Sequence, residues 1–261
     1  MGEVALWRRL AAEFLGSAFL AALVIGSGIA AQRLSPGDTG LELLENAAAT
    51  AGGLFAIILM FGPVSGGHFN PVVSFVDAAF HGISWRDAAA YLPAQVAGCT
   101  VGAIAANVMF SLPAVSISVN HRASPAHFLS EVIATLGLML VIFALARSGR
   151  SRATPAAVGA YIGAAYFFTS SASFANPAIT IGRMFSDTFA GIAPSSAPSF
   201  AGAQIIGGIL AVGVMKVLYP GMTAAEAADV TVPHSHADTS AKPESDSARN
   251  VTSAAGSHIH R

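Results

Sequence analysis

Two asparagine–proline pairs, Asn70-Pro71 and Asn176-Pro177, are the residues of this chain best placed to do chemistry. Asn is a favoured N-cap and Pro a favoured first residue of a helix, so each pair predicts a helix start. Asn side chains donate and accept hydrogen bonds but are neither nucleophiles nor proton carriers. The chemistry that the pattern predicts is therefore hydrogen bonding to a neutral molecule, without catalysis.

Two carboxylates and two further amides accompany these pairs at matched intervals. The order Glu, Asn-Pro, Gln occurs twice, at separations of 118, 106 and 109 residues, as Glu13, Asn70, Gln95 and Glu131, Asn176, Gln204. Inside apolar helices, Glu13 and Glu131 are either a proton relay of a coupled transporter or structural acceptors for loop amides. Their symmetric placement favours the structural role, and we expect Gln95 and Gln204 to bind the same loops.

The composition indicates an integral membrane protein. Hydrophobic residues make up 54% of the 261 residues and charged residues only 10%, against roughly 25% charged in soluble domains. A net charge of −1 gives no basis for binding nucleic acid. Cys99 is the only cysteine, so no intrachain disulfide is possible. We expect no cofactor and no bound metal.

Six apolar stretches are long enough to cross a bilayer, which needs about 20 residues. They cover roughly 10–32, 43–62, 87–110, 127–147, 153–171 and 199–219. The apolar runs after the Asn-Pro pairs, about ten residues each, are too short to cross. Arg residues concentrate before the first span and in alternate loops, so the positive-inside rule predicts that both termini are cytoplasmic.

The repeat must be inverted, because each copy holds three spans and an odd number reverses the direction of the chain. We predict an all-α membrane fold of six transmembrane helices and two re-entrant half-helices, with repeat one at about 8–110 and repeat two at about 127–220. Inverted repeats with broken helices place a solute site near the midplane.

Residues 224–261 differ in character: they are polar, with no apolar periodicity, and predict a disordered cytoplasmic tail. Two His-x-His pairs occur there, at His234 and His236 and at His258 and His260. They either bind a transition metal or are incidental to a solvated tail. The second interpretation is favoured, because no Cys or carboxylate has ligand spacing.

Polar backbone at membrane depth is tolerated where it lines a wet cavity or is buried in protein. We therefore expect two segments to offer carbonyl groups to a solute, namely Gly66, Gly67, His68, Phe69 and Ala172, Ser173, Phe174, Ala175. The two Asn side chains should meet at the centre of the pore, together with Pro71, Val72, Pro177 and Ala178. The positive ends of the two half-helices would oppose cations there.

With these motifs in view, residues of about 8–220 resemble the aquaporin and aquaglyceroporin family of major intrinsic proteins. The duplicated Asn-Pro motif, the Ala-Glu-Phe-Leu-Gly segment around Glu13 and the paired Gln residues carry the resemblance. It implies that residues 1–223 form an aquaporin-like channel domain, with a pore in each subunit of a homotetramer in the cell membrane. The first motif departs from the usual Asn-Pro-Ala, because Val72 adds two methyl groups.

A second departure concerns the selectivity filter of the family. Members usually carry Arg three residues after the second Asn, where this chain has Ile179. Offsets from the two motifs place Thr50, Ala164 and Ser173 at the other filter positions. The four residues predict a wide, uncharged filter, which resembles bacterial aquaporins associated with arsenic resistance. Arg183, four residues further on, either replaces the missing Arg or lies at the outer surface paired with Asp187; we favour the surface position.

The expected function is a passive channel for small neutral solutes: arsenite and antimonite hydroxides, glycerol and similar polyols, and also water. Three alternatives remain at this point. One is a proton-coupled transporter that uses Glu13 or Glu131, another is a water-dominated channel, and the third is a structural member whose path is closed by Val72 or Phe174. The expected partners are small solutes, membrane lipid and further copies of the chain.

Overall fold

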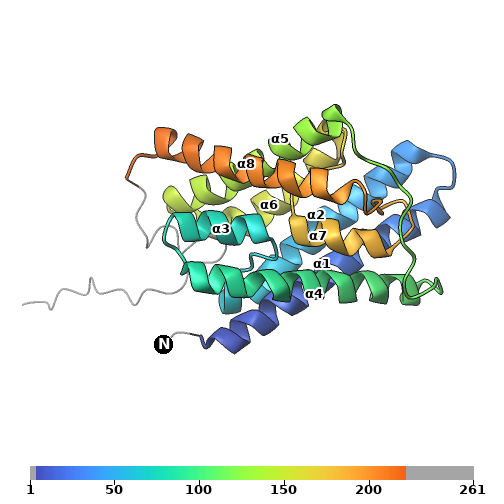
Figure 1. Ribbon diagram of the computed structural model, residues 1–261, viewed down its shortest axis with the longest axis horizontal. Helices are drawn as coiled ribbons and strands as arrows, with labels where there is room; N and C mark the ends of the chain where they lie inside the picture. Colours follow the sequence, from blue (N-terminus) through green and yellow to red (C-terminus); the bar gives the residue numbers. More distant parts are fainter. Residues whose placement is uncertain (1–3, 222–261) are drawn as a thin grey trace, which may run out of the picture.

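The computed structural model describes residues 4–221, and every regular element in that range is a helix (Figure 1). The helices, in chain order, are α1 Leu6–Leu34, α2 Thr39–Ser65, α3 Pro71–Ala79, α4 Trp85–Met109, α5 Pro125–Arg147, α6 Thr154–Phe168, α7 Pro177–Gly182 and α8 Ala197–Leu218, with the 3-10 turns η1 Ser151–Ala153 and η2 Arg183–Phe185. The predicted tail at 224–261, with its His-x-His pairs, lies outside the described residues.

Five of the helices, α1, α2, α4, α5 and α8, are long and apolar enough to span a membrane. The remaining predicted span, at 153–171, is shorter in the structure, because α6 has 15 residues and follows directly on η1. It ends early since Thr169 is extended and its hydroxyl donates to the Ala165 carbonyl at 2.6 Å, which satisfies an acceptor at the helix end. The chain then enters the loop that leads to α7.

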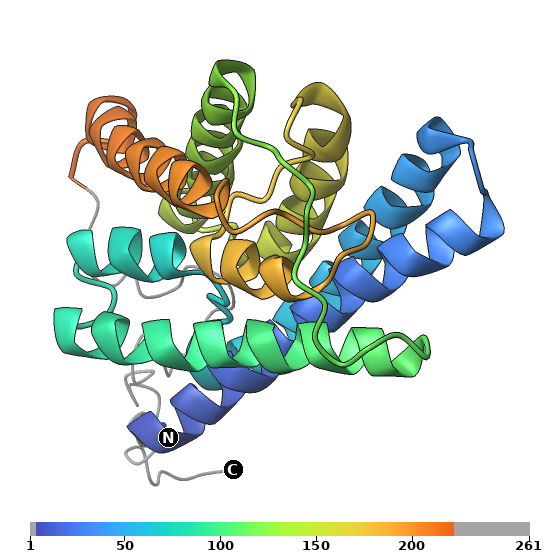
Figure 2. The ribbon, with the colours of Figure 1, turned by 45° about the vertical axis from the view of Figure 1, so that its right-hand side comes forward.

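The two half-helices, α3 and α7, lie end to end in the middle of the bundle, with their first residues facing each other (Figures 1 and 2). α3 runs back toward the side of the chain's N-terminus, and α7 runs toward the opposite side. Both begin at a Pro and both are capped by the Asn before it, whose side-chain oxygen accepts from the first turn. The sequence-based helix starts are therefore confirmed.

Close backbone approach holds the long helices together. α1 packs on α4, and α5 packs on α8 in the other half of the chain. A Cβ on Gly98 of α4 would lie 2.2 Å from the Phe14 carbonyl oxygen of α1, and one on Gly207 of α8 would lie 2.6 Å from the Val132 carbonyl of α5. Only glycine permits such contacts, as is common between membrane helices. The same glycine-mediated packing thus occurs at corresponding places in both halves.

Candidate functional site: a cavity between the two half-helices

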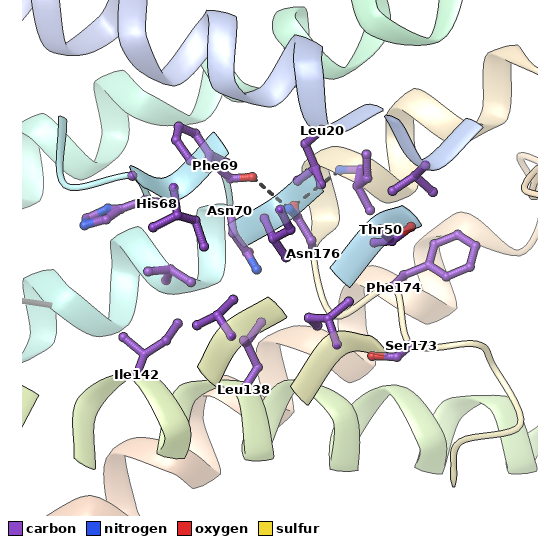
Figure 3. Close-up of a pocket in the computed structure, with 18 of the residues that line it drawn as sticks. Leu20, Thr50, His68, Phe69, Asn70, Leu138, Ile142, Ser173, Phe174 and Asn176 are labelled. Atoms are coloured by element: carbon purple, nitrogen blue, oxygen red, sulfur yellow. Dashed lines mark hydrogen bonds between the residues drawn. The ribbon is translucent and has the colours of Figure 1, made fainter. Parts of the chain in front are cut away.

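The two motif asparagines are tied to each other's loops at the centre of the molecule. Asn70 Nδ2 donates to the Ala175 carbonyl at 2.8 Å, and Asn176 Nδ2 donates to the Phe69 carbonyl at 2.7 Å. Each Asn oxygen accepts from the start of its own half-helix. A side-chain amide has two N–H groups, so each Asn retains one further donor. Both residues line a cavity at the junction of the two half-helices (Figure 3).

The loops reach this geometry through left-handed backbone at non-glycine residues. Phe69 and Ala175, which directly precede the two Asn residues, both have φ of 48°, and Ala172 and Ser173 have φ of 56° and 43°. Left-handed backbone disfavours residues with a Cβ by roughly 1–2 kcal/mol each. Neighbouring contacts must therefore stabilise both loops, and the conformation aims the Phe69 and Ala175 carbonyls at the opposite Asn.

Glu13 supplies that support in the first half of the chain. Its carboxylate accepts four hydrogen bonds: from Ser65 Oγ at 2.6 Å, the His68 N–H at 3.0 Å, the Phe69 N–H at 2.7 Å and Gln95 Nε2 at 2.7 Å. The side chain is fully buried. Backbone amides that have no helical partner are thus satisfied by a carboxylate, which is a strong acceptor.

Glu131 has the equivalent place in the second half. It accepts from the Phe174 N–H at 2.9 Å, the Ala175 N–H at 2.8 Å and Gln204 Nε2 at 2.7 Å. Each Gln also donates to a hydroxyl on its half-helix: Gln95 to Ser74 Oγ at 3.1 Å and Gln204 to Thr180 Oγ1 at 3.0 Å. The carboxylates and amides therefore fix the two loops from behind.

The cavity that runs past the two asparagines is polar on one side and aliphatic on the other. Its polar side is made by Asn70, Asn176 and the loop segments that include Gly67, His68, Phe69, Ser173 and Phe174. The lining also includes eight aliphatic side chains: Leu20, Val24, Leu54, Ile58, Leu138, Ile142, Val158 and Ile162. Figure 3 shows Leu138 and Ile142 across the cavity from the asparagines. The cavity volume that the centres of water molecules can occupy is about 60 Å³. One water needs roughly 10–15 Å³ by the same measure, so the cavity has room for several.

Several predicted pore residues are displaced from the cavity wall. Gly66 caps the end of α2, and the Ala175 carbonyl is taken by Asn70; neither residue lines the cavity, and Ala172 does not either. Pro71, Val72, Pro177 and Ala178 also stand outside the lining. Asn70 and Asn176 alone among the six predicted centre residues face the space, because the first helical residues turn away behind the N-cap.

The extra methyl groups of Val72 point away from the cavity. A Cβ added to Gly208 of α8 would lie 2.5 Å from Val72 Cγ1, so the glycine leaves room for the valine. Val72 is 3% exposed and forms part of the core. The suggestion that Val72 closes the path is therefore wrong, since its bulk is accommodated between α3 and α8.

One end of the cavity, which we call the filter end, contains three of the four predicted filter residues. Thr50, Ser173 and Ile179 line it, whereas Ala164 is exposed on α6 and does not. Tyr166 lines the cavity instead, and its hydroxyl lies 3.2 Å from Thr50 Oγ1. Residues two apart on a helix point to nearly opposite faces. The four-residue spacing of Val158, Ile162 and Tyr166 is the signal that identifies the cavity face of α6.

Arg183 also belongs to the filter end, and the expectation of a surface arginine is wrong. Its side chain is buried at 2% exposure and lines the cavity. Its Nε donates to the Ala190 carbonyl, and its guanidinium carbon lies 3.4 Å from the centre of the Phe174 ring. Asp187 forms no ion pair with it, and the Asp187 carboxylate instead accepts from the Val119 N–H at 3.0 Å.

Arg122, from the loop before α5, lies over the same aromatic ring, 5.5 Å from its centre. Its guanidinium donates to the Gly191 and Phe189 carbonyls at 2.9 and 3.0 Å. Burial lowers the pKa of the Arg122 guanidinium, which nevertheless remains cationic at neutral pH because arginine begins so far above it. Arg122 does not line the cavity.

At the opposite end of the cavity lies His68, which Figure 3 shows on the side away from Thr50 and Phe174. Its Nδ1 lies 3.0 Å from Ser74 Oγ and its Nε2 lies 3.5 Å from Asp77 Oδ2, a buried carboxylate on α3. Among residues 4–221, no group of three His, Cys, Asp or Glu side chains is arranged to hold a metal ion.

Comparison with known proteins agrees with this architecture. The family described as Major intrinsic protein matches residues 1–174. Aquaglyceroporin AqpS from Rhizobium meliloti (strain 1021) is 45% identical over 218 residues, which cover 84% of this chain and 93% of the relative. The lens fiber major intrinsic protein of Bos taurus is 26% identical over 235 residues, covering 82% of this chain and 80% of that protein.

A solved structure has the same fold. The X-ray structure of the aquaglyceroporin from Plasmodium falciparum superposes with a TM-score of 0.65 at 22% identity and covers 83% of this chain and 98% of its own. The family match ends at residue 174, before the second Asn-Pro pair. The second half of the bundle is supported by this superposition and by the matched contacts of Glu131, Asn176 and Gln204.

Six helices around two half-helices, with hydrogen-bonding groups lining a cavity at their junction, together with the family match and the 45% identical aquaglyceroporin, define a multi-pass membrane channel rather than an enzyme. The passage that such a fold provides is passive and serves small solutes. The chain belongs to the major intrinsic protein family.

Proposed function

We propose that the chain conducts small neutral solutes with several hydroxyl groups, namely glycerol and similar polyols and the trihydroxides of arsenic and antimony, together with water. The two-sided cavity carries this proposal. The amide side chains of Asn70 and Asn176 lie on one side, and aliphatic side chains such as Leu138 and Ile142 lie across from them. A polyol presents hydroxyls on one edge and carbon on the other, so it replaces its hydration shell on the polar side and contacts the apolar wall elsewhere.

Ile179 supports passage of solutes larger than water. It is 3% exposed and lines the filter end, where a family Arg would place a guanidinium into the path. The branched aliphatic side chain leaves the cavity wider and removes five donors at that position. AqpS and the Plasmodium falciparum protein are both named aquaglyceroporins, which agrees with conduction beyond water. Tyr166 makes the filter narrower and more polar than Ala164 would.

The arrangement in the cell is also part of the proposal. Exposed aliphatic and aromatic side chains on the long helices, such as Phe19, Leu59 and Ile209, fit contact with lipid or with other subunits. We infer a homotetramer in the plasma membrane with one pore in each subunit and both termini in the cytoplasm. Glu13 and Glu131 act as loop supports, because their oxygens are already engaged by three or four donors.

The test is stopped-flow light scattering on proteoliposomes that contain wild type, Ile179→Arg or the matched aliphatic control Ile179→Leu. Wild type should conduct glycerol and arsenous acid well above empty vesicles. Ile179→Arg should lower both solute fluxes by about tenfold and water flux by less than about threefold. Ile179→Leu should leave every flux within about twofold.

Two results would contradict the proposal. Wild-type vesicles that pass water alone would show a water channel whose filter is narrowed by other groups at that end. An equal fall of water and solute fluxes in Ile179→Arg would show that residue 179 does not select by size.

A further inference from the structure

The filter end of the cavity contains a buried cation that the motif comparison does not assign. Arg183 lies four residues after Ile179, one helical turn along α7 and η2. We propose that Arg183 takes the part of the missing filter arginine: it excludes cations and donates hydrogen bonds to the oxygen atoms of a passing neutral solute. This assignment rests on the proposed channel function and names the group that selects within it.

Arg183 is held in place by groups that leave its charge available. Nε is engaged by the Ala190 carbonyl, and the guanidinium lies over Phe174. Phe174 itself is fixed edge-on against Phe200, with ring centres 4.9 Å apart. Cation–π contact with a fixed ring orients a guanidinium without neutralising it. The remaining N–H groups are therefore presented by a rigid support, which a filter needs.

No carboxylate within the described part of the chain forms an ion pair with Arg183. Glu131 acts on it through space, but its oxygens are occupied by the Phe174 and Ala175 amides and by Gln204. Arg122 adds a second positive charge beside the same ring. A buried charge without a counter-ion is unfavourable unless water or a polar ligand solvates it. At this position the water or solute in the pore solvates the Arg183 guanidinium.

Three hydroxyl groups complete the surroundings of the proposed site. Ser173 Oγ is buried and has no hydrogen-bond partner among residues 4–221, and Thr50 and Tyr166 pair only with each other in the hydrogen bonds of this part of the chain. Hydroxyls both donate and accept, whereas Arg183 only donates. Solutes with two or more oxygen atoms close together, as in a vicinal diol or a trihydroxide, can meet Arg183 and Ser173 at once. A monovalent cation meets a repelling charge.

The size of the cation barrier follows from Coulomb's law. A monovalent cation that passes within about 6 Å of the guanidinium, at an effective dielectric constant of about 20, is disfavoured by roughly a hundredfold. Removing the charge should therefore raise cation leak by a factor between about ten and a hundred. Neutral solutes lack this repulsion, so their fluxes should change far less.

The experiment measures sodium and proton leak, together with glycerol flux, in proteoliposomes that contain equal amounts of folded protein. Arg183→Gln removes the charge and keeps a donor; Arg183→Lys keeps the charge. The matched control is Arg122→Gln, which removes a guanidinium from the same ring but not from the cavity wall. Arg183→Gln should leak at least about tenfold more than wild type, and Arg183→Lys should stay within about threefold. Arg122→Gln should leak less than Arg183→Gln, because its guanidinium does not line the cavity.

A double variant, Ile179→Arg with Arg183→Ile, moves the guanidinium back to the usual family position and keeps one charge in the filter. It should restore cation exclusion, which also tests the idea if Arg183→Gln does not fold. Folded Arg183→Gln with wild-type leak would overturn the assignment, as would equal leak from Arg122→Gln. Absence of glycerol flux in wild type would instead refute the proposed function, while the leak comparison would still report on Arg183.

Discussion

Replacement of Glu131 by Gln separates a structural carboxylate from a proton carrier. Glu131 accepts from the Phe174 and Ala175 amides and from Gln204, and all three bonds are shorter than 3 Å. A Gln at this position has one oxygen and one NH₂ group. In the better of its two orientations, the Gln oxygen keeps the hydrogen bonds from the Ala175 N–H and from Gln204. The NH₂ group then faces the Phe174 N–H, and because both groups are donors that hydrogen bond is lost.

The expected loss of stability follows from these contacts. The Phe174 N–H becomes buried and unpaired, which costs about 1–3 kcal/mol. The two remaining bonds change from charge-assisted to neutral, and each weakens by about 1 kcal/mol. The total is about 3–5 kcal/mol, which for a chain of this size lowers Tm on the order of 10 °C. The left-handed loop should lose its shape, and solute flux should fall with it.

Thermal unfolding in detergent and glycerol flux in vesicles, with and without a pH gradient, check this expectation. Gln204→Met is the graded control, because it removes one donor and leaves both backbone bonds to Glu131; it should cost less, about 1–3 kcal/mol. The reasoning is refuted by a Glu131→Gln protein with wild-type Tm that has lost only uphill, gradient-driven flux. That outcome would identify a proton-coupled transporter.

Three other substitutions test separate features. Gly208→Ala should destabilise by about 1–3 kcal/mol through its contact with Val72, and Val72→Ala in the same chain should recover part of that loss in a double-mutant cycle; strictly additive effects would contradict the packing. Asn176→Asp loses the donor to the Phe69 carbonyl and brings negative charge to the centre, so proton leak should rise; an unchanged leak in folded protein would place Asn176 away from the path. Gly98→Ala should prevent stable assembly, measured as loss of the folded peak in size-exclusion chromatography, because its Cβ would meet the backbone of α1; normal assembly would show that α1 and α4 can separate.

The sequence predicted features that depend on local chemistry. The starts of the two half-helices could be predicted at Asn70 and Asn176, because Asn is a favoured N-cap and Pro a favoured first residue of a helix. The Glu and Gln repeats indicated groups that act on equivalent loops, and the structure places them there. The packing between helices could not be predicted in the same way. The Val72 methyl groups pack against Gly208, which is far along the chain and in another helix.

The filter end could be predicted only in part. The prediction of Ala164 used a fixed number of residues before Asn176. An irregular loop lies between the two positions, so the number did not identify the cavity face of α6, which carries Tyr166. Arg183 was misplaced for a related reason. A short stretch that passes from α-helix to a 3-10 turn does not keep a fixed direction, and the ring of Phe174, which captures the guanidinium, comes from the other side of the motif.

The crossed hydrogen bonds at the centre have a consequence for biosynthesis. The acceptor of the Asn70 amide lies 105 residues further along the chain, and the donor to the Phe69 carbonyl lies 107 residues further. At about 5–20 residues per second, the first loop waits roughly 5–20 seconds before its partners have been translated. During that interval its polar backbone cannot remain exposed to lipid. The first half-helix must therefore stay at the aqueous interface or in the insertion machinery, and it settles at membrane depth only when the second half arrives.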